Sequence, residues 1–224
     1  MLFRSRDDNA INAGAEGHSV KQYLRDFAGL RKNRSLMLVG SSSAMRTMTQ
    51  AGLMTFLPVY LAFELDYSPF AVGICMTVLQ VAGFIAGPVG GHFADKWGRR
   101  QMIMSSMLLS GAMIIGMVLA GRSMWFVVFI ALVGFFLYAM RAVLQAMAIE
   151  AVPKNLAGAG VGLQFGFTSL GAAISPSIFG LIADSYDIHK AFYFLAGTIV
   201  LANLLVFFLP KESDQPATQA SAAR

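Results

Sequence analysis

Long apolar stretches with almost no charge alternate along the chain with short polar gaps. A helix needs about 20 apolar residues to cross the hydrocarbon core of a bilayer, and six stretches reach that length. Strands of a membrane barrel would be near ten residues long and alternate in polarity, so these stretches predict helices. The six predicted helices are Leu36–Phe63, Phe70–Gly90, Gln101–Ala120, Met124–Ile149, Leu156–Ile182 and Ala191–Leu209.

The gaps between the predicted helices carry turn residues, which are expected to end each helix. They are Asp66–Pro69, Asp95–Arg100, Gly121–Ser123, Pro153–Asn155 and Asp184–Lys190. The pattern therefore predicts an all-α membrane protein with a six-helix transmembrane domain over residues 36–210.

Two polar segments flank this predicted domain. In residues 1–35, apolar positions recur at helical spacing up to Leu30 among basic residues, which favours either an amphipathic helix on the membrane surface or a disordered basic linker. The segment lacks the apolar core of a signal peptide. Residues 211–224 are small and polar, and we expect them to be a disordered tail.

Composition and charge agree with a membrane protein and give its orientation. Only 13% of residues are charged, against about 25% in soluble domains. If the N-terminus is cytoplasmic, 13 of the 17 Lys and Arg residues lie on that side and only Arg122 and Lys190 on the other. The positive-inside rule then places both termini in the cytoplasm and the protein in the cell membrane. Because the net charge of +5 follows this topology, we expect no nucleic-acid partner.

Two short sequences recur in the second half of the predicted domain. Ala44–Ala51 (AMRTMTQA) recurs 95 residues later as Ala139–Ala146 (AMRAVLQA), and Gly91–Asp95 (GHFAD) recurs 89 residues later as Gly180–Asp184 (GLIAD). Helices 1–3 thus match helices 4–6. Because three is odd, the two units cross the membrane in opposite senses, which predicts an inverted 3+3 repeat of the kind found in secondary transporters.

The gap after the second predicted helix carries the most specific motif. Residues Gly91–Arg100 read GHFADKWGRR, which resembles the major facilitator signature G-x-x-x-D-[RK]-x-G-[RK]-[RK] in the position where that family has it. Gly87–Gly91, Glu150–Pro153 and Gly171–Gly180 also look like the family. The resemblance covers about Val20 to Leu209. It implies the C-terminal half of a twelve-helix transporter, with residues 1–35 similar to the linker between the halves.

Simple chemistry suggests what the residues of this motif do. Gly91 would let the second helix approach a neighbour closely, and Gly98 would permit a tight turn. Asp95 could accept hydrogen bonds from the N-terminal end of a facing helix. The resemblance implies that the motif is a cytoplasmic latch that forms and breaks during alternating access; the alternative is a basic loop that only obeys the positive-inside rule. The predicted latch residues are Gly91, Asp95, Gly98, Arg99, Arg100 and Glu150, with Arg99 able to pair with Glu150.

Arg46 and Arg141 fall inside predicted helices, where an arginine costs roughly 2.5–3.5 kcal/mol on insertion scales. Each lies ten residues from a cytoplasmic helix end, or about 15 Å at 1.5 Å per residue. Both are therefore expected near the midplane, where transporter substrate sites lie. Polar neighbours share their helix faces, and in the resembled family the first and fourth helices of each half line the central cavity. The candidate substrate-binding residues are Arg46, Gln50, Tyr138, Arg141 and Gln145.

No Asp or Glu lies in the middle of a predicted helix, so an organic anion is a candidate partner for the two arginines. Alternatively, they pair with carboxylates of a missing half or snorkel to the interface. Gln80 and Gln164 could face the cavity, although bridges between helices are favoured. We expect no metal, no cofactor and no enzymatic activity, because no metal-ligand cluster, phosphate-binding GxxxxGK[ST] motif or nucleophile–base pattern is present.

These features predict a secondary transporter of a small solute that works by alternating access in the lipid bilayer. Such a transporter would need a second six-helix half, either a second copy or a separate N-terminal half. The alternative is a truncated or accessory membrane subunit that does not transport.

Overall fold

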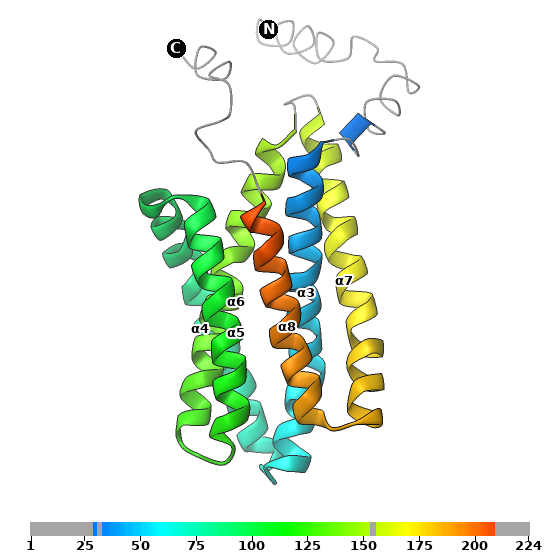
Figure 1. Ribbon diagram of the computed structural model, residues 1–224. Coiled ribbons are helices and arrows are strands. Elements are labelled where there is room, and N and C mark those ends of the chain that lie inside the picture. The colour runs from blue at the N-terminus through cyan, green and yellow to red at the C-terminus, as the bar shows by residue number, and fades with distance from the viewer. Residues whose placement is uncertain (1–28, 31–32, 153–155, 209–224) are drawn as a thin grey trace, which may run out of the picture.

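A computed structural model describes residues 29–30, 33–152 and 156–208. Within these ranges the chain is helical, which confirms the all-α prediction (Figure 1). A short π-helix, η1 (Tyr60–Glu64), continues the first long helix just after Pro58. The long helices are α3 (Arg34–Val59), α4 (Pro69–Trp97), α5 (Arg99–Ala120), α6 (Trp125–Glu150), α7 (Ala157–Ser185) and α8 (Ile188–Phe207).

Five of these helices, α4 to α8, are long and apolar enough to cross a membrane. Among the described helices, α3 has the length but not the hydropathy, because polar residues occupy its middle third. Its buried residues include Ser42, Ser43, Arg46 and Thr49, so these four polar side chains of α3 face other helices.

The break between α4 and α5 lies within the predicted range Asp95–Arg100, but it is only one residue long. Helix α4 continues to Trp97 and α5 begins at Arg99, so Gly98 alone separates them. Gly98 has a φ of 90°, which glycine adopts without the strain that a side chain would bring. The polar residues before it do not end the helix, because hydropathy locates the membrane boundary and a helix can extend beyond it. Gly91 and Asp95 therefore lie in a helix and not in a loop.

Local capping explains where other helices begin. Asn33 accepts a hydrogen bond from the backbone N–H of Leu36, and its own amide donates to the carbonyl of Ala151 at 2.6 Å. One residue thus caps α3 and ties it to the end of α6. Ser68 caps α4, with Pro69 at the first helical position. Asp187 caps α8 three residues earlier than the hydropathy predicts.

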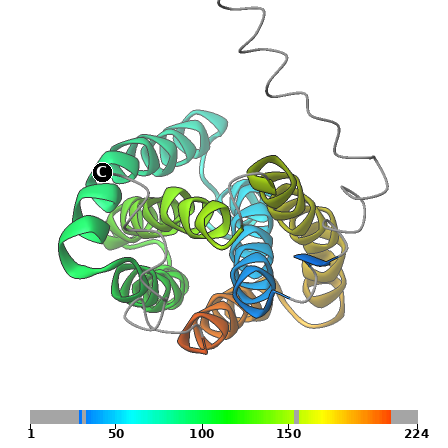
Figure 2. The same ribbon diagram turned by 90° about the horizontal axis from the view of Figure 1, so that it is seen from above.

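The six long helices form a bundle in which segments distant in sequence lie side by side. Seen from above, α4, α5 and α6 gather on one side and α3, α7 and α8 on the other (Figure 2). The main packing pairs are α4 with α6, α3 with α7, α5 with α6, α5 with α8, and α3 with α8. Because consecutive helices along the chain run in opposite directions, α3 begins and α8 ends at the same end of the bundle (Figure 1).

Most of the predicted flanking segments lie outside the described residues. This applies to the tail up to residue 28, which holds most of the expected amphipathic helix, and to the C-terminal tail from residue 209. The predicted gap Pro153–Asn155 between the fourth and fifth helices also lies outside the described residues.

Candidate functional site

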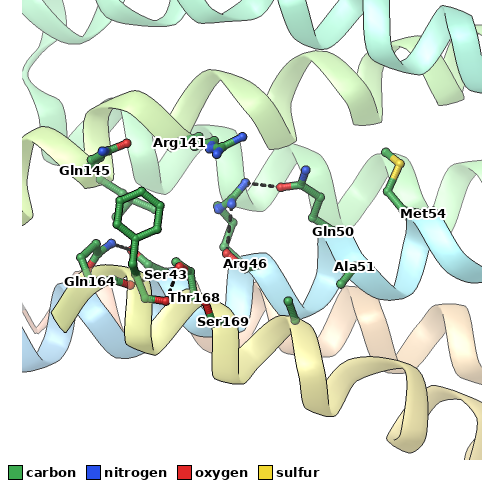
Figure 3. A pocket seen from close by; sticks show the side chains of 14 residues that line it. Ser43, Arg46, Gln50, Ala51, Met54, Arg141, Gln145, Gln164, Thr168 and Ser169 are labelled. Carbon is green, nitrogen blue, oxygen red and sulfur yellow. Dashed lines mark hydrogen bonds between the residues drawn. The ribbon is translucent and has the colours of Figure 1, made fainter. Parts of the chain in front are cut away.

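Helices α3, α6 and α7 enclose a cavity of about 330 Å³. Its wall contains both charged groups and amides, and within the described chain it contains no carboxylate. Figure 3 shows the side chains that point into it. The polar lining residues are Ser43, Arg46, Thr47, Gln50, Arg141, Gln145, Gln164, Thr168 and Ser169.

Arg46 is buried in the wall of this cavity, with only 4% of its surface exposed. One terminal nitrogen donates to Gln50 Oε1 at 3.0 Å and to the carbonyl of Leu137 at 3.1 Å. The other donates to Thr47 Oγ1 at 3.0 Å. All three acceptors are neutral, so the charge of Arg46 is solvated by dipoles and not balanced by an anion of the described chain.

Arg141 comes from α6 and is exposed. Its guanidinium group points toward that of Arg46 across the cavity (Figure 3). In the described part of the chain, Arg141 makes neither a hydrogen bond nor an ion pair. Two like charges therefore face one open space, and such an arrangement favours an anion between them.

The structure brings together four of the five candidate substrate residues. Gln50 and Gln145 line the cavity together with the two arginines. Tyr138 does not line it; its hydroxyl donates to Gln80 Oε1 of α4 at 2.6 Å. Helix α6 contacts both α3 and α4, and Tyr138 lies on the side that contacts α4.

Helix α7 forms a wall of the cavity, of which the sequence analysis named only Gln164. Gln164, Thr168 and Ser169 line the cavity from this helix. The amide nitrogen of Gln164 donates to Ser43 Oγ at 2.6 Å, which makes Gln164 a bridge between helices as well as a lining residue. Its Oε1 is buried without a hydrogen-bond partner among the described residues. The spacing of these polar residues, at i, i+4 and i+5 of an apolar helix, is the signal that would have found them.

Part of the cavity wall is apolar. Ala51, Met54, Leu144, Phe165 and Ala172 complete the lining. A cavity with a cationic region and an apolar region suits a small solute that carries a charged group and a hydrocarbon part.

The predicted latch residues occupy the end of the bundle where α4 ends and α5 begins. Arg99 and Glu150 form an ion pair between α5 and α6, and this is the pair that the sequence analysis expected. Arg100 donates to the carbonyl of Phe207 at the end of α8 and lies 5.4 Å from the centre of its ring. Two adjacent arginines thus tie α5 to two different helices.

The other expectations for this motif are met only in part. A Cβ on Gly91 would have no neighbour within 4 Å, so Gly91 does not mediate a close approach. The preceding residue does: a Cβ on Gly90 would lie 2.7 Å from the carbonyl oxygen of Ala139 on α6. Consecutive residues of a helix face different directions, and sequence alone could not tell which glycine meets α6. Asp95 is exposed and has no bond to any residue that the structure describes.

The opposite end of the bundle has its own polar contacts. Arg122 forms an ion pair with Asp66 between the two turns at that end. The carboxylate of Asp187 lies 3.1 Å from Nδ1 of His189, and this contact holds the pKa of the Asp187 carboxyl below its usual value of 3.8. Within the described ranges, no group of three or more His, Cys, Asp or Glu side chains could hold a metal ion.

A cavity lined by two arginines in a helical bundle does not by itself identify the protein family. The sequence model of the Major Facilitator Superfamily matches residues 39–224, which is most of the chain. The chain belongs to the major facilitator superfamily. Its fold and its apolar helices are thus those of a membrane-embedded, multi-pass transporter family.

Relatives within the superfamily are longer than this chain. Multidrug resistance protein MdtG from several Escherichia coli strains is 31% identical over 173 residues, which cover 75% of this chain and 42% of MdtG. A crystal structure of the E. coli fucose:proton symporter FucP has a TM-score of 0.72 at 15% identity, over 86% of this chain and 46% of FucP. A second FucP structure, in the outward conformation, matches equally well. This chain spans less than half the length of these relatives, and the likeness to FucP shows the shared fold alone.

Proposed function

We propose that this chain is one six-helix half of a secondary transporter, and that it moves a small organic anion by alternating access. The observation that carries the proposal is the meeting of Arg46 and Arg141 in one cavity whose described lining has no carboxylate. An intramembrane arginine is costly unless it faces a polar cavity or a partner. An anionic substrate would supply that partner, because a guanidinium fork matches a carboxylate or phosphate group.

In this proposal α3 spans the membrane together with α4 to α8. The polar side chains in the middle of α3, from Ser42 to Gln50, are buried against neighbouring helices or face the cavity, so lipid would not have to solvate them. Both termini lie on the cytoplasmic side, as the distribution of basic residues indicates.

Helix packing supports the proposed inverted repeat. In the repeat, α3 corresponds to α6, α4 to α7 and α5 to α8. The contact between α4 and α6 therefore corresponds to the contact between α7 and α3, and both are main packing pairs. The repeated alanines each meet a glycine: a Cβ on Gly171 of α7 would lie 2.2 Å from the carbonyl oxygen of Ala44, and a Cβ on Gly90 of α4 would lie 2.7 Å from that of Ala139. The two alanines correspond in the repeat, whereas the two glycines do not. Each contact connects the first helix of one repeat to the second helix of the other.

The motif around Gly98 would be the latch of the alternating-access cycle. Arg99 and Arg100 already connect α5 to α6 and α8 at that end, whereas Asp95 is exposed and free to meet another unit. We propose that its partner is the N-terminal end of a helix in a second six-helix half.

A drug-like cation or neutral compound is the second candidate substrate. It is favoured by the 31% identity to MdtG and by the apolar wall of the cavity. The electrostatics of the cavity favour the anion, because a cationic drug would be repelled by both guanidinium groups.

Uptake by the purified chain in liposomes tests the two candidates. Three poorly permeant probes would be compared with protein-free liposomes: carboxyfluorescein as the anion, ethidium as the cation and radiolabelled fucose as the uncharged solute. We expect uptake of carboxyfluorescein alone. Uptake of ethidium or fucose without carboxyfluorescein would overturn the anion proposal, and no uptake of any probe would favour a subunit that does not transport.

A further inference from the structure

The two arginines of the cavity are in different structural situations. Resting on the proposed anion transport, we infer that Arg141 is the residue that binds and selects the anion, whereas Arg46 is a positioning residue that holds α3 against α6. The proposal follows from the hydrogen bonds, exposure and mutual placement of the two side chains.

The guanidinium group of Arg46 is already engaged by the protein. It has three hydrogen bonds to neutral acceptors, and 4% of its surface is exposed. Two of the acceptors belong to α3, and the third is the backbone carbonyl of Leu137 on α6. Leu137 lies one helical turn before Arg141, so Arg46 fixes the α3–α6 spacing next to the residue that faces it. An anion could compete for Arg46 only by displacing these bonds.

The guanidinium group of Arg141, unlike that of Arg46, is accessible to an anion in the cavity. It is exposed, it points into the cavity, and none of its N–H groups is used by a described residue. Gln145, one turn further along α6, is half-buried and lines the same wall. A carboxylate bound by both N–H groups of the Arg141 fork could therefore also receive a hydrogen bond from the Gln145 amide.

The geometry also separates the effects of the two residues on stability. In the anion-free chain the two guanidinium groups repel each other, so the charge of Arg141 is destabilising. Arg46 experiences the same repulsion but also forms the cross-link between α3 and α6. Substitutions that keep the charge but remove the planar fork should therefore weaken anion binding at Arg141 and weaken the fold at Arg46.

Lysine substitutions in the full chain in lipid nanodiscs test this division. The readouts are the unfolding temperature without anion and the Kd for benzoate, with benzyl alcohol as the uncharged control ligand. We expect R141K to bind benzoate about tenfold more weakly, because the fork is lost, at an unchanged unfolding temperature. We expect R46K to unfold several degrees lower and to weaken benzoate binding less than R141K does. R122K at the far end of the bundle is the matched control and should change neither.

Charge removal gives a second, independent readout. R141Q should abolish the rise in unfolding temperature that benzoate produces, and it should raise the unfolding temperature of the anion-free chain. R141K with full benzoate affinity, or R46K with the larger loss of affinity and no loss of stability, would overturn the division. The effect of R141K on the benzoate Kd tests the proposal even if R46K fails to fold. If the native chain binds no benzoate, the proposed function fails, while the opposite stability effects at the two arginines can still be measured.

Discussion

Single glycines let pairs of helix backbones touch where a methyl group would not fit. A Cβ on Gly171 would lie 2.2 Å from the carbonyl oxygen of Ala44, and one on Gly134 would lie 2.3 Å from that of Leu79. Backbone atoms cannot move aside as a flexible side chain can. Small residues at such positions are the usual means by which membrane helices approach closely.

We therefore expect Gly171→Ala to lower the free energy of unfolding by about 1–3 kcal/mol, because α7 must move away from α3. Gly166→Ala on the same helix is the matched control, since nothing lies within 4 Å of a Cβ there. The control should be neutral or slightly stabilising, as alanine favours helices over glycine. Unfolding in mixed detergent micelles measures both, and equal effects of the two substitutions would refute the close contact.

At Asp187 the expected effect depends on pH. Hydrogen bonds from the side chain and the backbone N–H of His189 hold the pKa of the Asp187 carboxyl below 3.8. Because the folded pKa is the lower one, the stabilisation is present above pH 3.8 and is lost as pH falls through the folded value. Asp187→Asn keeps a capping side chain that does not titrate. The unfolding temperature of the native chain relative to this variant should fall as pH is lowered from about 5 to 3, where the Asp187 carboxylate takes up its proton.

Asp95 has no described partner within its own chain, so its substitution should leave the fold intact. If it belongs to a latch between halves, Asp95→Asn should reduce carboxyfluorescein uptake by the chain in liposomes without changing its membrane insertion or unfolding temperature. If uptake is unchanged when equal amounts of protein are reconstituted, the latch hypothesis is wrong. The motif would then be a basic segment that only obeys the positive-inside rule.

At the scale of elements, a polar seam joins α3 to α8. Thr49 Oγ1 lies 2.8 Å from Thr198 Oγ1, and the hydroxyl of Ser42 donates to the carbonyl of Ala202 at 3.1 Å. Hydrogen bonds between membrane helices contribute about 0.6 kcal/mol on average. Thr49→Val keeps the side-chain shape and removes the hydroxyl, so we expect a loss of this size in unfolding free energy. Thr55→Val is the control, because Thr55 is exposed and bonds only within α3; a loss there as large as at Thr49 would argue against the seam.

The positions of the helices could be predicted from sequence, whereas several of their ends could not. Hydropathy marks where lipid begins, and α4 extends past that boundary to Trp97 because nothing before Gly98 interrupts its backbone. At α8, by contrast, the helix starts at the residue after a capping side chain, Asp187, and not at the first long apolar run. Capping residues and glycines therefore set the residues at which these helices begin and end, which average hydropathy does not specify.

The candidate site shows a similar limit. Charges inside apolar stretches identified Arg46 and Arg141, because a buried charge needs a polar environment. Periodicity could not separate Tyr138 from them, since α6 touches two helices and its polar residues divide between the two contacts. On α7 the sequence pointed only to Gln164, and Thr168 and Ser169 were missed because the polar residues of this helix are uncharged and few. Knowing which helices are neighbours, and not only which faces are polar, is what completes the cavity.

At the scale of the molecule, the described part of this chain has about half the helices that the proposed cycle requires. The chain covers 42% of MdtG and 46% of FucP. If transport uses two copies, the purified chain in nanodiscs should have twice its own mass of 24.1 kDa. A single copy per disc, together with carboxyfluorescein uptake by the same chain in liposomes, would overturn the need for a second half. A single copy per disc without uptake in liposomes would direct the search to a separate partner chain.

Because α3 begins and α8 ends at the same end of the bundle, this unit returns the chain to the side from which it started. A duplicated gene could therefore be fused head to tail through a surface loop alone, and the second copy would insert with the same orientation as the first. A unit with an odd number of helices would need an extra crossing for the same fusion. The bundle thus has the geometry of a module that evolution can double in a single step.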